Sequence, residues 1–239
     1  MLLELNQVCK RFGAVVVADK INLSVNEGEA LGVIGANGAG KSSLFNLITG
    51  VIPADSGSIR LAGEDVTRRS VKDRCLAGIG RSFQIPQPFE TLTVFENLYT
   101  AAMFGTRDVQ DRVNFCADIL RRTGLLDKAN TVAGSLTLLN RKRLELARAL
   151  ATRPRLLLLD EIAGGLTEAE CHELVTLIKS LHAGGITIVW IEHVVHALLS
   201  VATRLIVLES GRMIAEGDPR EVMASPEVKR SYLGVDEVA

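Results

Sequence analysis

The sequence predicts an α/β fold in which helices cover both faces of a parallel β-sheet. Two apolar runs indicate strands of such a sheet, one at residues 30–34 before a glycine-rich loop and one at 155–161 that ends in two acids. A continuous apolar run is typical of parallel strands, because both faces of those sheets are buried. Helical periodicity follows each run, and this alternation of strand and helix is the third observation behind the prediction.

The loop after the first run has the spacing of a phosphate-binding loop. Gly35 begins and Ser42 ends the segment G-A-N-G-A-G-K-S, which fits G-x-x-x-x-G-K-[ST] between a strand and a helix. The glycines allow backbone N–H groups to turn inward around a polyphosphate, and the new helix adds its positive end. We expect Lys41 to reach the β- and γ-phosphates of ATP and the Ser42 hydroxyl to ligate a bridging Mg²⁺.

A purely structural glycine turn is the alternative, but it gives the Lys-Ser pair at the helix start no purpose. The expected nucleotide-binding residues are Gly35, Asn37, Gly38, Gly40, Lys41, Ser42 and Ser43. The predicted fold class is therefore a P-loop NTPase with a RecA-like α/β core, and the expected cofactors are ATP and Mg²⁺.

Composition narrows the class of partner and the compartment. The 239 residues are 47% hydrophobic and 23% charged, and their formal net charge of -1 argues against nucleic acid as a partner. The four cysteines are scattered without a C-x-x-C pair, which favours reduced thiols in a cytosol-like compartment. The opening M-L-L-E-L-N is unlike a basic signal-peptide region, and no apolar run approaches about 18 residues. We therefore expect neither secretion nor a membrane span.

The N-terminal segment is expected to form a small antiparallel β-subdomain. Residues 2–8 alternate apolar and polar side chains, and residues 14–25 contain two more short strand-like runs before a turn at 26–29. Phe12 falls in the expected loop between these strands, where an exposed ring could stack on adenine for roughly 1–3 kcal/mol. A phenylalanine that only packs the loop is an equal alternative.

A proline-rich stretch follows the phosphate-binding helix, which is expected at 42–49. The pattern between them predicts a hairpin at 57–65, a helix at 70–77 and a strand at 78–83 that ends at Gln84. Two prolines hold residues 85–89 extended. Five of the ten aromatic residues lie nearby and favour either a partner-binding surface or a helical core, namely Phe83, Phe89, Phe95, Tyr99 and Phe104.

Residues 91–151 are expected to form a helical subdomain inserted into a single nucleotide-binding domain, whose α/β core comprises 1–90 and 152–239. The helical patterns lie at 94–103, 109–123 and 141–150, and Gly124 ends the second. After the strand at 155–161 the sequence predicts helices at 168–182 and 194–200, strands at 186–191, 204–208 and 213–216, and helical turns at 219–223 and 226–232.

Acidic and histidine side chains end two of the predicted strands, which is where ligands gather in parallel sheets. Asp160 is expected to hold Mg²⁺ through water, and Glu161 to polarise the attacking water. His193 follows the next strand and is expected within reach of the γ-phosphate. Acids that merely cap the next segment, and a histidine that only packs, are the alternatives.

Together these motifs resemble the nucleotide-binding subunit of an ABC transporter over essentially the whole chain. They are G-A-N-G-A-G-K-S-S, the strand ending in Gln84, A-R-A-L before L-L-L-L-D-E, and I-E-H. Within that superfamily, G-I-G-R-S-F-Q, L-T-V-F-E-N-L, I-E-H-V-V-H-A-L and S-Y-L-G are similar to the ATPase subunits of branched-chain amino acid importers. The resemblance implies ATP hydrolysis coupled to solute import, by a peripheral protein on the cytoplasmic face of the inner membrane.

The resemblance also implies a role for each matching residue. It assigns phosphate and Mg²⁺ to Lys41 and Ser42, the general base to Glu161 and the γ-phosphate to His193. Gln84 is expected to contact the metal, to sense the γ-phosphate and to transmit its state to a membrane partner, so the expected catalytic residues are Glu161, His193 and Gln84. Phe12 corresponds to the adenine-stacking position. Residues 84–89, from Gln84 to Phe89, are the expected docking surface for transmembrane permease subunits.

Three positions depart from the family pattern. Ile162 replaces the proline that usually follows the catalytic Glu, and Thr167 stands where Asp or Asn is common. The signature L-S-G-G-Q reads L-T-L-L-N at 136–140, where Thr137 keeps a hydroxyl donor but two leucines add bulk at the expected phosphate approach. We favour pairing with a second ATPase subunit that has an intact signature, a heterodimer, over a homodimer, because importers of the resembled type commonly use two different ATPase subunits.

Several other functions fit the same motifs. The chain could drive transport of another solute, such as urea or an amide, an organic acid or a lipid. A soluble ABC ATPase acting on ribosomes or DNA usually has two P-loops or a long coiled coil, and this chain has neither. A weakly hydrolysing ATP-dependent dimerisation module is supported by the altered signature and opposed by the intact Glu161 and His193.

Overall fold

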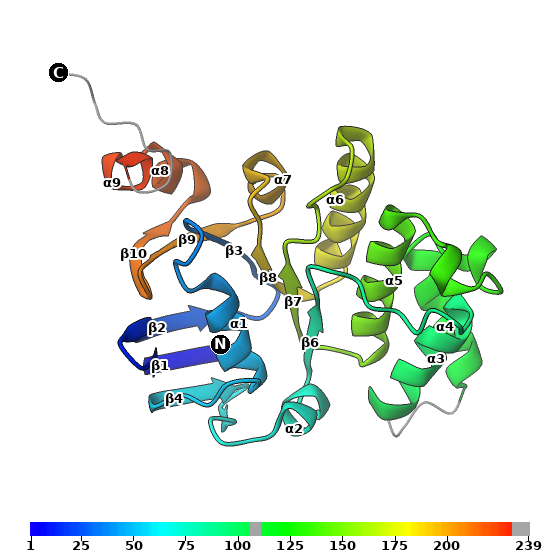
Figure 1. Ribbon diagram of the computed structural model, residues 1–239, viewed down its shortest axis with the longest axis horizontal. Coiled ribbons are helices and arrows are strands. Elements are labelled where there is room, and N and C mark those ends of the chain that lie inside the picture. Colours follow the sequence, from blue (N-terminus) through cyan, green and yellow to red (C-terminus); the bar gives the residue numbers. More distant parts are fainter. Residues whose placement is uncertain (106–110, 231–239) are drawn as a thin grey trace.

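The computed structural model describes residues 1–105 and 111–230, which form two β-sheets flanked by helices (Figure 1). The antiparallel sheet has the order β2-β1-β4-β5, with β1 (Leu3–Phe12), β2 (Val15–Val25), β4 (Ser56–Leu61) and β5 (Glu64–Asp65). The second sheet has the order β10-β9-β3-β8-β7-β6, and all its strands except β10 run parallel. Its strands are β3 (Ala30–Ile34), β6 (Ile79–Ser82), β7 (Leu156–Asp160), β8 (Thr187–Ile191), β9 (Arg204–Glu209) and β10 (Arg212–Gly217).

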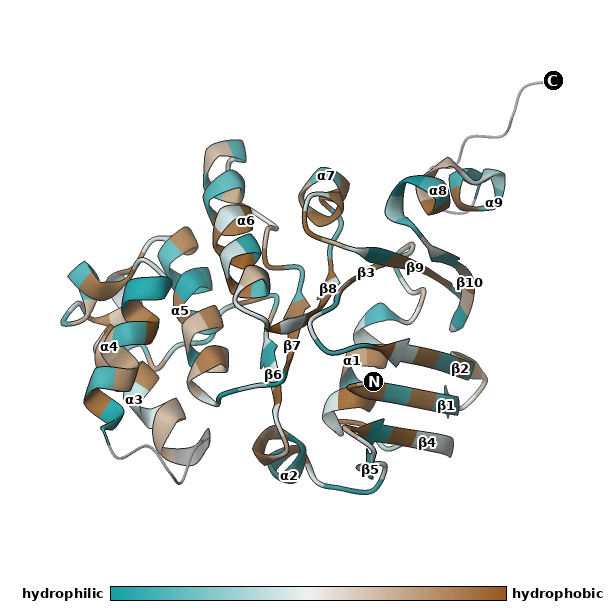
Figure 2. Ribbon diagram, turned by 180° about the vertical axis from the view of Figure 1, so that it is seen from behind, coloured by the Kyte–Doolittle hydropathy of each residue, from teal (hydrophilic) through white to brown (hydrophobic). Residues whose placement is uncertain are grey.

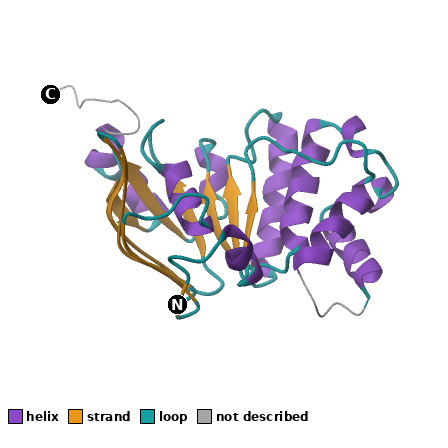
Figure 3. Ribbon diagram, turned by 60° about the horizontal axis from the view of Figure 1, so that its bottom comes forward, coloured by secondary structure: helices purple, strands orange, loops and turns teal. Residues whose placement is uncertain are grey.

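The helices are α1 (Lys41–Thr49), α2 (Val71–Leu76), α3 (Val94–Gly105), α4 (Arg112–Arg122), α5 (Leu138–Ala151), α6 (Glu168–Ala183), α7 (Val195–Leu199), α8 (Pro219–Ala224) and α9 (Pro226–Val228), with 3-10 turns η1 (Leu126–Lys128) and η2 (Ala133–Ser135). Helices α3, α4 and α5 pack together, and α5 also packs against β6 and α6. Figure 3 shows this block of helices on the opposite side of the parallel strands from the antiparallel sheet. The predicted α/β core, β-subdomain and helical segment are all present.

Alternate residues of the parallel strands bury their side chains on opposite faces of the sheet. In β7, Leu157 and Leu159 pack in one hydrophobic cluster with α5 and α6, whereas Leu156 and Leu158 pack in another with α1 and the antiparallel sheet. All four side chains are fully buried, and each such leucine stabilises the fold by roughly 1.5–3 kcal/mol. Figure 2 shows β7 in the hydrophobic colour. The expectation of a sheet covered on both faces is confirmed.

The first hairpin differs from its prediction. Residues 15–25 form one strand instead of two runs, and β1 continues past residue 8 to Phe12. A β-bulge explains the difference, because the register between the strands shifts and Lys20 has a left-handed backbone with φ 52°. A bulge breaks the alternation of side chains and so imitates a strand end. Phe12 therefore ends β1 opposite Val15, and the prediction that placed it in a loop was wrong.

Helix α5 begins at Leu138, ahead of the predicted start at residue 141. Thr137 sets this start, since its hydroxyl oxygen accepts the backbone N–H of Asn140 at 3.4 Å as an N-cap. The helix predicted at 109–123 corresponds to α4, which begins at Arg112, while residues 109 and 110 lie outside the described part of the chain. The end of the helical turn predicted at 226–232, and the S-Y-L-G segment, lie outside it as well.

The clustered aromatic residues divide between the two alternatives. Phe95 and Tyr99 stack with their ring centroids 5.8 Å apart and pack against the core of the helical segment. Phe83 and Phe89 are instead 51% and 48% exposed. The side chain of Phe104 lies outside the described residues. Different members of the cluster thus form a core and a surface.

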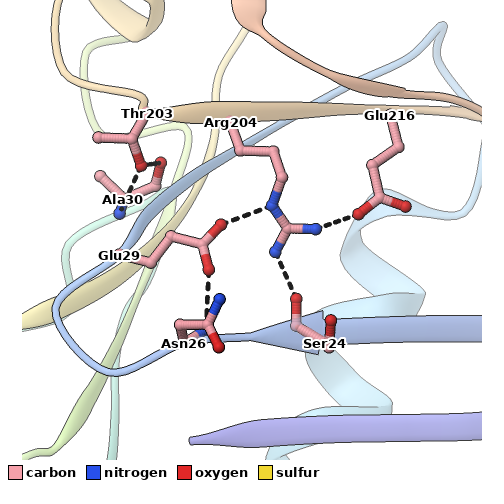
Figure 4. A network of polar contacts seen from close by, with 7 residues as sticks. All are labelled: Ser24, Asn26, Glu29, Ala30, Thr203, Arg204 and Glu216. Carbon is pink, nitrogen blue, oxygen red and sulfur yellow. Dashed lines mark hydrogen bonds and ion pairs between the residues drawn. The ribbon is translucent and has the colours of Figure 1, made fainter. Parts of the chain in front are cut away.

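Arg204 joins the two sheets near the start of β3 (Figure 4). Its guanidinium pairs with Glu29 at 2.5 Å and with Glu216, and donates to the carbonyl oxygen of Ser24 at the end of β2. Glu29 also accepts the backbone N–H of Asn26 at 2.8 Å. The arginine has donors for several acceptors at once, and so it holds β2, β3, β9 and β10 in one arrangement.

A second arginine ties α2 to the end of α1. Arg74 is only 2% exposed, and its guanidinium donates to the carbonyl oxygens of Leu47 at 2.6 Å, Ile48 at 2.9 Å and Thr67 at 2.8 Å. The last carbonyls of a helix have no partner within it and carry a partial negative charge. Arg74 therefore caps the helix that begins at the phosphate-binding loop.

Replacing this arginine should destabilise the protein. We expect Arg74→Met to lower the free energy of unfolding by about 3 kcal/mol, because it leaves several buried carbonyl oxygens without donors. Chemical denaturation of the purified protein measures the change. The control is Arg121→Met, which removes an exposed pair with Asp118 and should cost less than about 1 kcal/mol. Equal losses in the two variants would contradict the role given to Arg74.

Candidate functional site

The carboxyl ends of four parallel strands meet at one edge of the six-stranded sheet. Strands β3, β8, β7 and β6 are neighbours in that order. The loops that follow Ile34, Ile191, Asp160 and Ser82 therefore start side by side. Most of the candidate residues lie on or beside these loops, the exceptions being Phe12 in β1 and Thr137 before α5. Strand pairing brings the four loops together.

The loop after β3 needs its glycines for close packing. A side chain at Gly35 would lie 2.3 Å from the carbonyl oxygen of Leu208, and one at Gly40 would lie 2.6 Å from that of Val17. Gly38 has φ +82° with open space beside it. The loop is thus wedged between β9 and β2 while its outer turn stays open, as a phosphate cradle requires.

Lys41 lies inside this loop. Its ammonium donates to the carbonyl oxygens of Gly35 at 2.7 Å and Ala36 at 3.0 Å, and the side chain is buried. Burial lowers the pKa of Lys41, while the charges of Glu161 and Asp160 act in the opposite direction. A bound phosphate would add a further negative charge that favours the ammonium form.

The three residues predicted to be catalytic converge on one carboxylate. Gln84 donates from Nε2 to Oε2 of Glu161 at 2.6 Å, and Nε2 of His193 lies 2.9 Å from Oε1 of Glu161. The backbone of Glu161 has the left-handed φ of 46°, a strained conformation that is common at active sites. Each oxygen of the expected general base thus contacts one of the other two residues.

Asp160 has a partner that the sequence analysis did not foresee. Its Oδ2 pairs with the guanidinium of Arg81 at 2.6 Å, and both side chains are nearly buried. Arg81 also donates to Oδ1 of Asn46 in α1 at 2.7 Å, and its charge lies over the rings of Phe45 and Phe83 at 5.6 and 5.0 Å. Arg81 lies on β6 beside β7, and no local pattern in the sequence shows that these two strands are neighbours.

The remaining predicted residues are exposed or half-buried. Asn37 and Ser42 are exposed, Ser43 is half-buried, and Ser42 lines one hollow together with Gln84 and Asp160. Phe12 is 52% exposed, with the ammonium of Lys10 5.1 Å from its ring centroid. Adenine stacking on Phe12 stays a prediction, as does a phosphate contact of Thr137, whose hydroxyl oxygen already caps α5.

The donor set fits ATP and Mg²⁺. The open glycine loop and the enclosed Lys41 suit a polyphosphate, and the hydroxyl of Ser42, the amide oxygen of Gln84 and the carboxylate of Asp160 are the hard oxygen ligands that Mg²⁺ prefers. The metal would neutralise charge on the phosphates when bound. The carboxylate of Glu161 lies at the same edge and contacts Gln84 and His193. A carboxylate in this place would be able to take a proton from water.

This fold and site define an ABC-type ATPase cassette. Residues 18–164 match the family model described as ABC transporter, and residues 212–238 match the model described as Branched-chain amino acid ATP-binding cassette transporter. The solved ADP conformation of an ATP-binding cassette of an ABC transporter has a TM-score of 0.89 at 31% identity, over 98% of this chain and 99% of that one. A nucleotide-free cassette has a TM-score of 0.87 at 30% identity, over 99% of both chains.

Curated relatives extend over the full chain. The High-affinity branched-chain amino acid transport ATP-binding protein BraF of Pseudomonas aeruginosa is 33% identical, over 98% of both chains. The LivG protein of Escherichia coli K12, with the same description, is 33% identical over 98% of both. The chain therefore belongs to the ABC transporter family, as an ATP-hydrolysing cassette of the branch that includes the branched-chain amino acid transport ATPases.

The role expected for Glu161 can be tested on the purified protein. We expect Glu161→Gln to retain ATP binding while turnover falls by on the order of 10²-fold or more, since the amide cannot take a proton from water. Lys41→Ala should instead lose ATP binding, because it removes the cation inside the loop. A fluorescent ATP analogue reports binding, and phosphate release reports turnover. Unchanged turnover of Glu161→Gln would sink the assignment of the base.

Proposed function

We propose that this chain couples ATP hydrolysis to the import of branched-chain or related amino acids. The observation that carries the substrate class is the full-length similarity to BraF and LivG, with the match of residues 212–238 to the branched-chain amino acid cassette model. Urea or amide, organic acid and lipid transport are the competing substrates. The proposed roles are water activation by Glu161, γ-phosphate contact by His193, and metal contact and signalling by Gln84.

The proposed transport needs a passage through the membrane, which we assign to partner subunits. Within residues 1–105 and 111–230, no helix combines the length and the apolar character that crossing a bilayer requires. We propose that transmembrane permease subunits bind the surface around residues 84–89. Here Ile85 is 70% exposed, between Phe83 and Phe89, and an apolar hollow of about 250 Å³ lies beside Phe83, between α2 and α5. Exposed apolar side chains around a hollow are typical of a protein-binding surface.

The surface is also joined to the proposed catalytic residues. Gln84 contacts Glu161 and begins the exposed stretch. Arg81 lines both the apolar hollow and the hollow that holds Asp160. A permease segment seated here would therefore contact side chains that also contact the nucleotide site. These contacts support the proposal that the surface transmits the nucleotide state.

Transport in membrane vesicles tests the substrate and the surface together. Expressed with its permease partners, the protein should drive ATP-dependent uptake of labelled leucine. Phe89→Asp should abolish both copurification with the permease and uptake, while leaving ATP binding intact, because it buries a charge in the proposed contact. The control is Val113→Asp on α4, whose side chain is 55% exposed, against 48% for Phe89, and lies outside residues 84–89. Uptake of another solute alone would contradict the substrate, and retained association of Phe89→Asp would rule out the surface.

The altered signature has an unequal effect at its two leucines. Leu138 is 43% exposed and lines a hollow with Gln84 and Glu161, whereas Leu139 is 8% exposed and belongs to the hydrophobic core. Only Leu138 thus adds bulk to the surface. It lies beside Gly165, where an added Cβ would be 3.4 Å from the Leu138 side chain. The sequence alone gives the two leucines the same expected effect. We keep the proposal of a heterodimer with a partner that has an intact signature, because a homodimer would carry this bulk at both sites.

Restoring the glycine tests this proposal. If the chain hydrolyses ATP alone as a homodimer limited by its signature, Leu138→Gly should raise its turnover by on the order of 10²-fold, the usual worth of one donor to phosphoryl charge. In a heterodimer the signature of this chain is expected to face the ATP that the partner subunit binds. Leu138→Gly should then speed up hydrolysis of that ATP only. Phosphate release, with ATP-dependent dimerisation checked by gel filtration, measures both cases. No gain in either case would refute the idea that Leu138 limits hydrolysis and favour the dimerisation module.

A further inference from the structure

Glu192 is a buried acid with no role in the site as described so far. It follows β8 directly, between Ile191 and His193, and is 1% exposed. Its Oε1 accepts the backbone N–H of Ala163 at 2.7 Å. Its Oε2 accepts the N–H groups of His193 at 2.9 Å and Val194 at 3.3 Å. One carboxylate therefore connects the loop after β7, which carries Glu161, to the loop after β8, which carries His193.

The connection uses the two oxygens of the acid separately. The N–H groups that it accepts lie beyond the strand ends, where the sheet offers them no partner. A carboxylate accepts at both oxygens, whereas an amide has one acceptor and one donor. Burial raises the pKa of Glu192, and the N–H donors of Ala163, His193 and Val194 oppose this effect. Only an acid satisfies both loops at once.

Lys142 of α5 is a buried cation near this acid. The side chain is 4% exposed, and burial lowers its pKa while the charges of Glu192 and Glu161 oppose that shift. Lys142 and Glu161 also line the same hollow. The charged and titratable groups near Glu192 are thus Lys142 from α5, Glu161 from the loop after β7, His193 beside it, and Cys171 from α6.

We propose that Glu192 is a positioning residue that latches the Glu161 loop to the His193 loop. The proposal rests on the roles proposed above for Glu161 and His193. The contact between the imidazole and Glu161 spans 2.9 Å and is made by side chains from these two loops. The hydrogen bonds of Glu192 to both backbones hold the loops at that distance, beside the bond from the Glu161 N–H to the carbonyl oxygen of Ile191 at 2.9 Å.

The first test is Glu192→Gln in the full chain. The amide must turn its NH₂ group toward one of the two loops. The hydrogen bonds to that loop are then lost while the side chain keeps its size. We expect kcat for ATP to fall about tenfold or more, with KM for ATP within about twofold, because misplaced groups slow the reaction more than they weaken binding. Hydrogen exchange of the nucleotide-free protein should show faster exchange at Ala163, or at His193 and Val194, with the P-loop unchanged.

Glu29→Gln is the matched control. Glu29 is also a nearly buried carboxylate that accepts a backbone N–H, from Asn26, and pairs with a cation, Arg204 (Figure 4). It lies at the opposite end of β3 from the nucleotide loops. This variant should lose thermal stability but keep kcat and the exchange pattern of both loops. If the two variants lose kcat in parallel with stability, Glu192 has only a structural role and the proposal fails.

The latch and the proposed base can fail separately. If Glu161→Gln leaves turnover unchanged while Glu192→Gln speeds amide exchange, the proposed base is wrong and the latch stands. Unchanged exchange in Glu192→Gln would overturn the latch itself.

Discussion

The parallel pairing of β3, β8, β7 and β6 is the constraint on which the site depends. Parallel strands present their carboxyl ends at one edge, so loops that are far apart in the sequence begin within one strand spacing of their neighbours. The phosphate loop, Asp160, Glu161, His193 and Gln84 all come from these loop starts. The pairing is secured by leucine, isoleucine and valine side chains buried on both faces of the sheet. The chemistry of the site thus depends on packing several residues away from it.

Sequence analysis predicted the residues whose role follows from local pattern. Glycine spacing identified the phosphate loop, and acids and a histidine after apolar runs identified Glu161 and His193. Gln84 and His193 both contact Glu161, because parallel strands bring their loops to one edge, while the roles of these residues stay predictions. Local patterns also predicted the α/β class, the antiparallel sheet and the helical segment. Each of these has its own periodicity of apolar residues in the sequence.

Partners that depend on strand order could not be predicted in this way. Arg81 reaches Asp160 only because β6 lies beside β7, and Glu192 reaches Ala163 only because β8 lies beside β7. Neither adjacency is visible in a local window of sequence. The start of α5 was placed too late because Thr137 and two leucines do not resemble the glycine-rich start of the family. The bulge at Lys20 concealed the continuity of β2, since a left-handed residue interrupts alternation in the same way as a turn.

Arg81 places two separate requirements on one side chain. It pairs with the carboxylate of Asp160 and also lies over Phe83, whose ring borders the apolar hollow on the outer surface. The guanidinium that balances the charge of Asp160 is therefore also part of the wall of the apolar hollow. A chimaera that joins the apolar hollow of one cassette to the nucleotide site of another has to transfer Arg81, Phe83 and Asp160 together. Recombination boundaries for such chimaeras consequently fall outside β6 and β7.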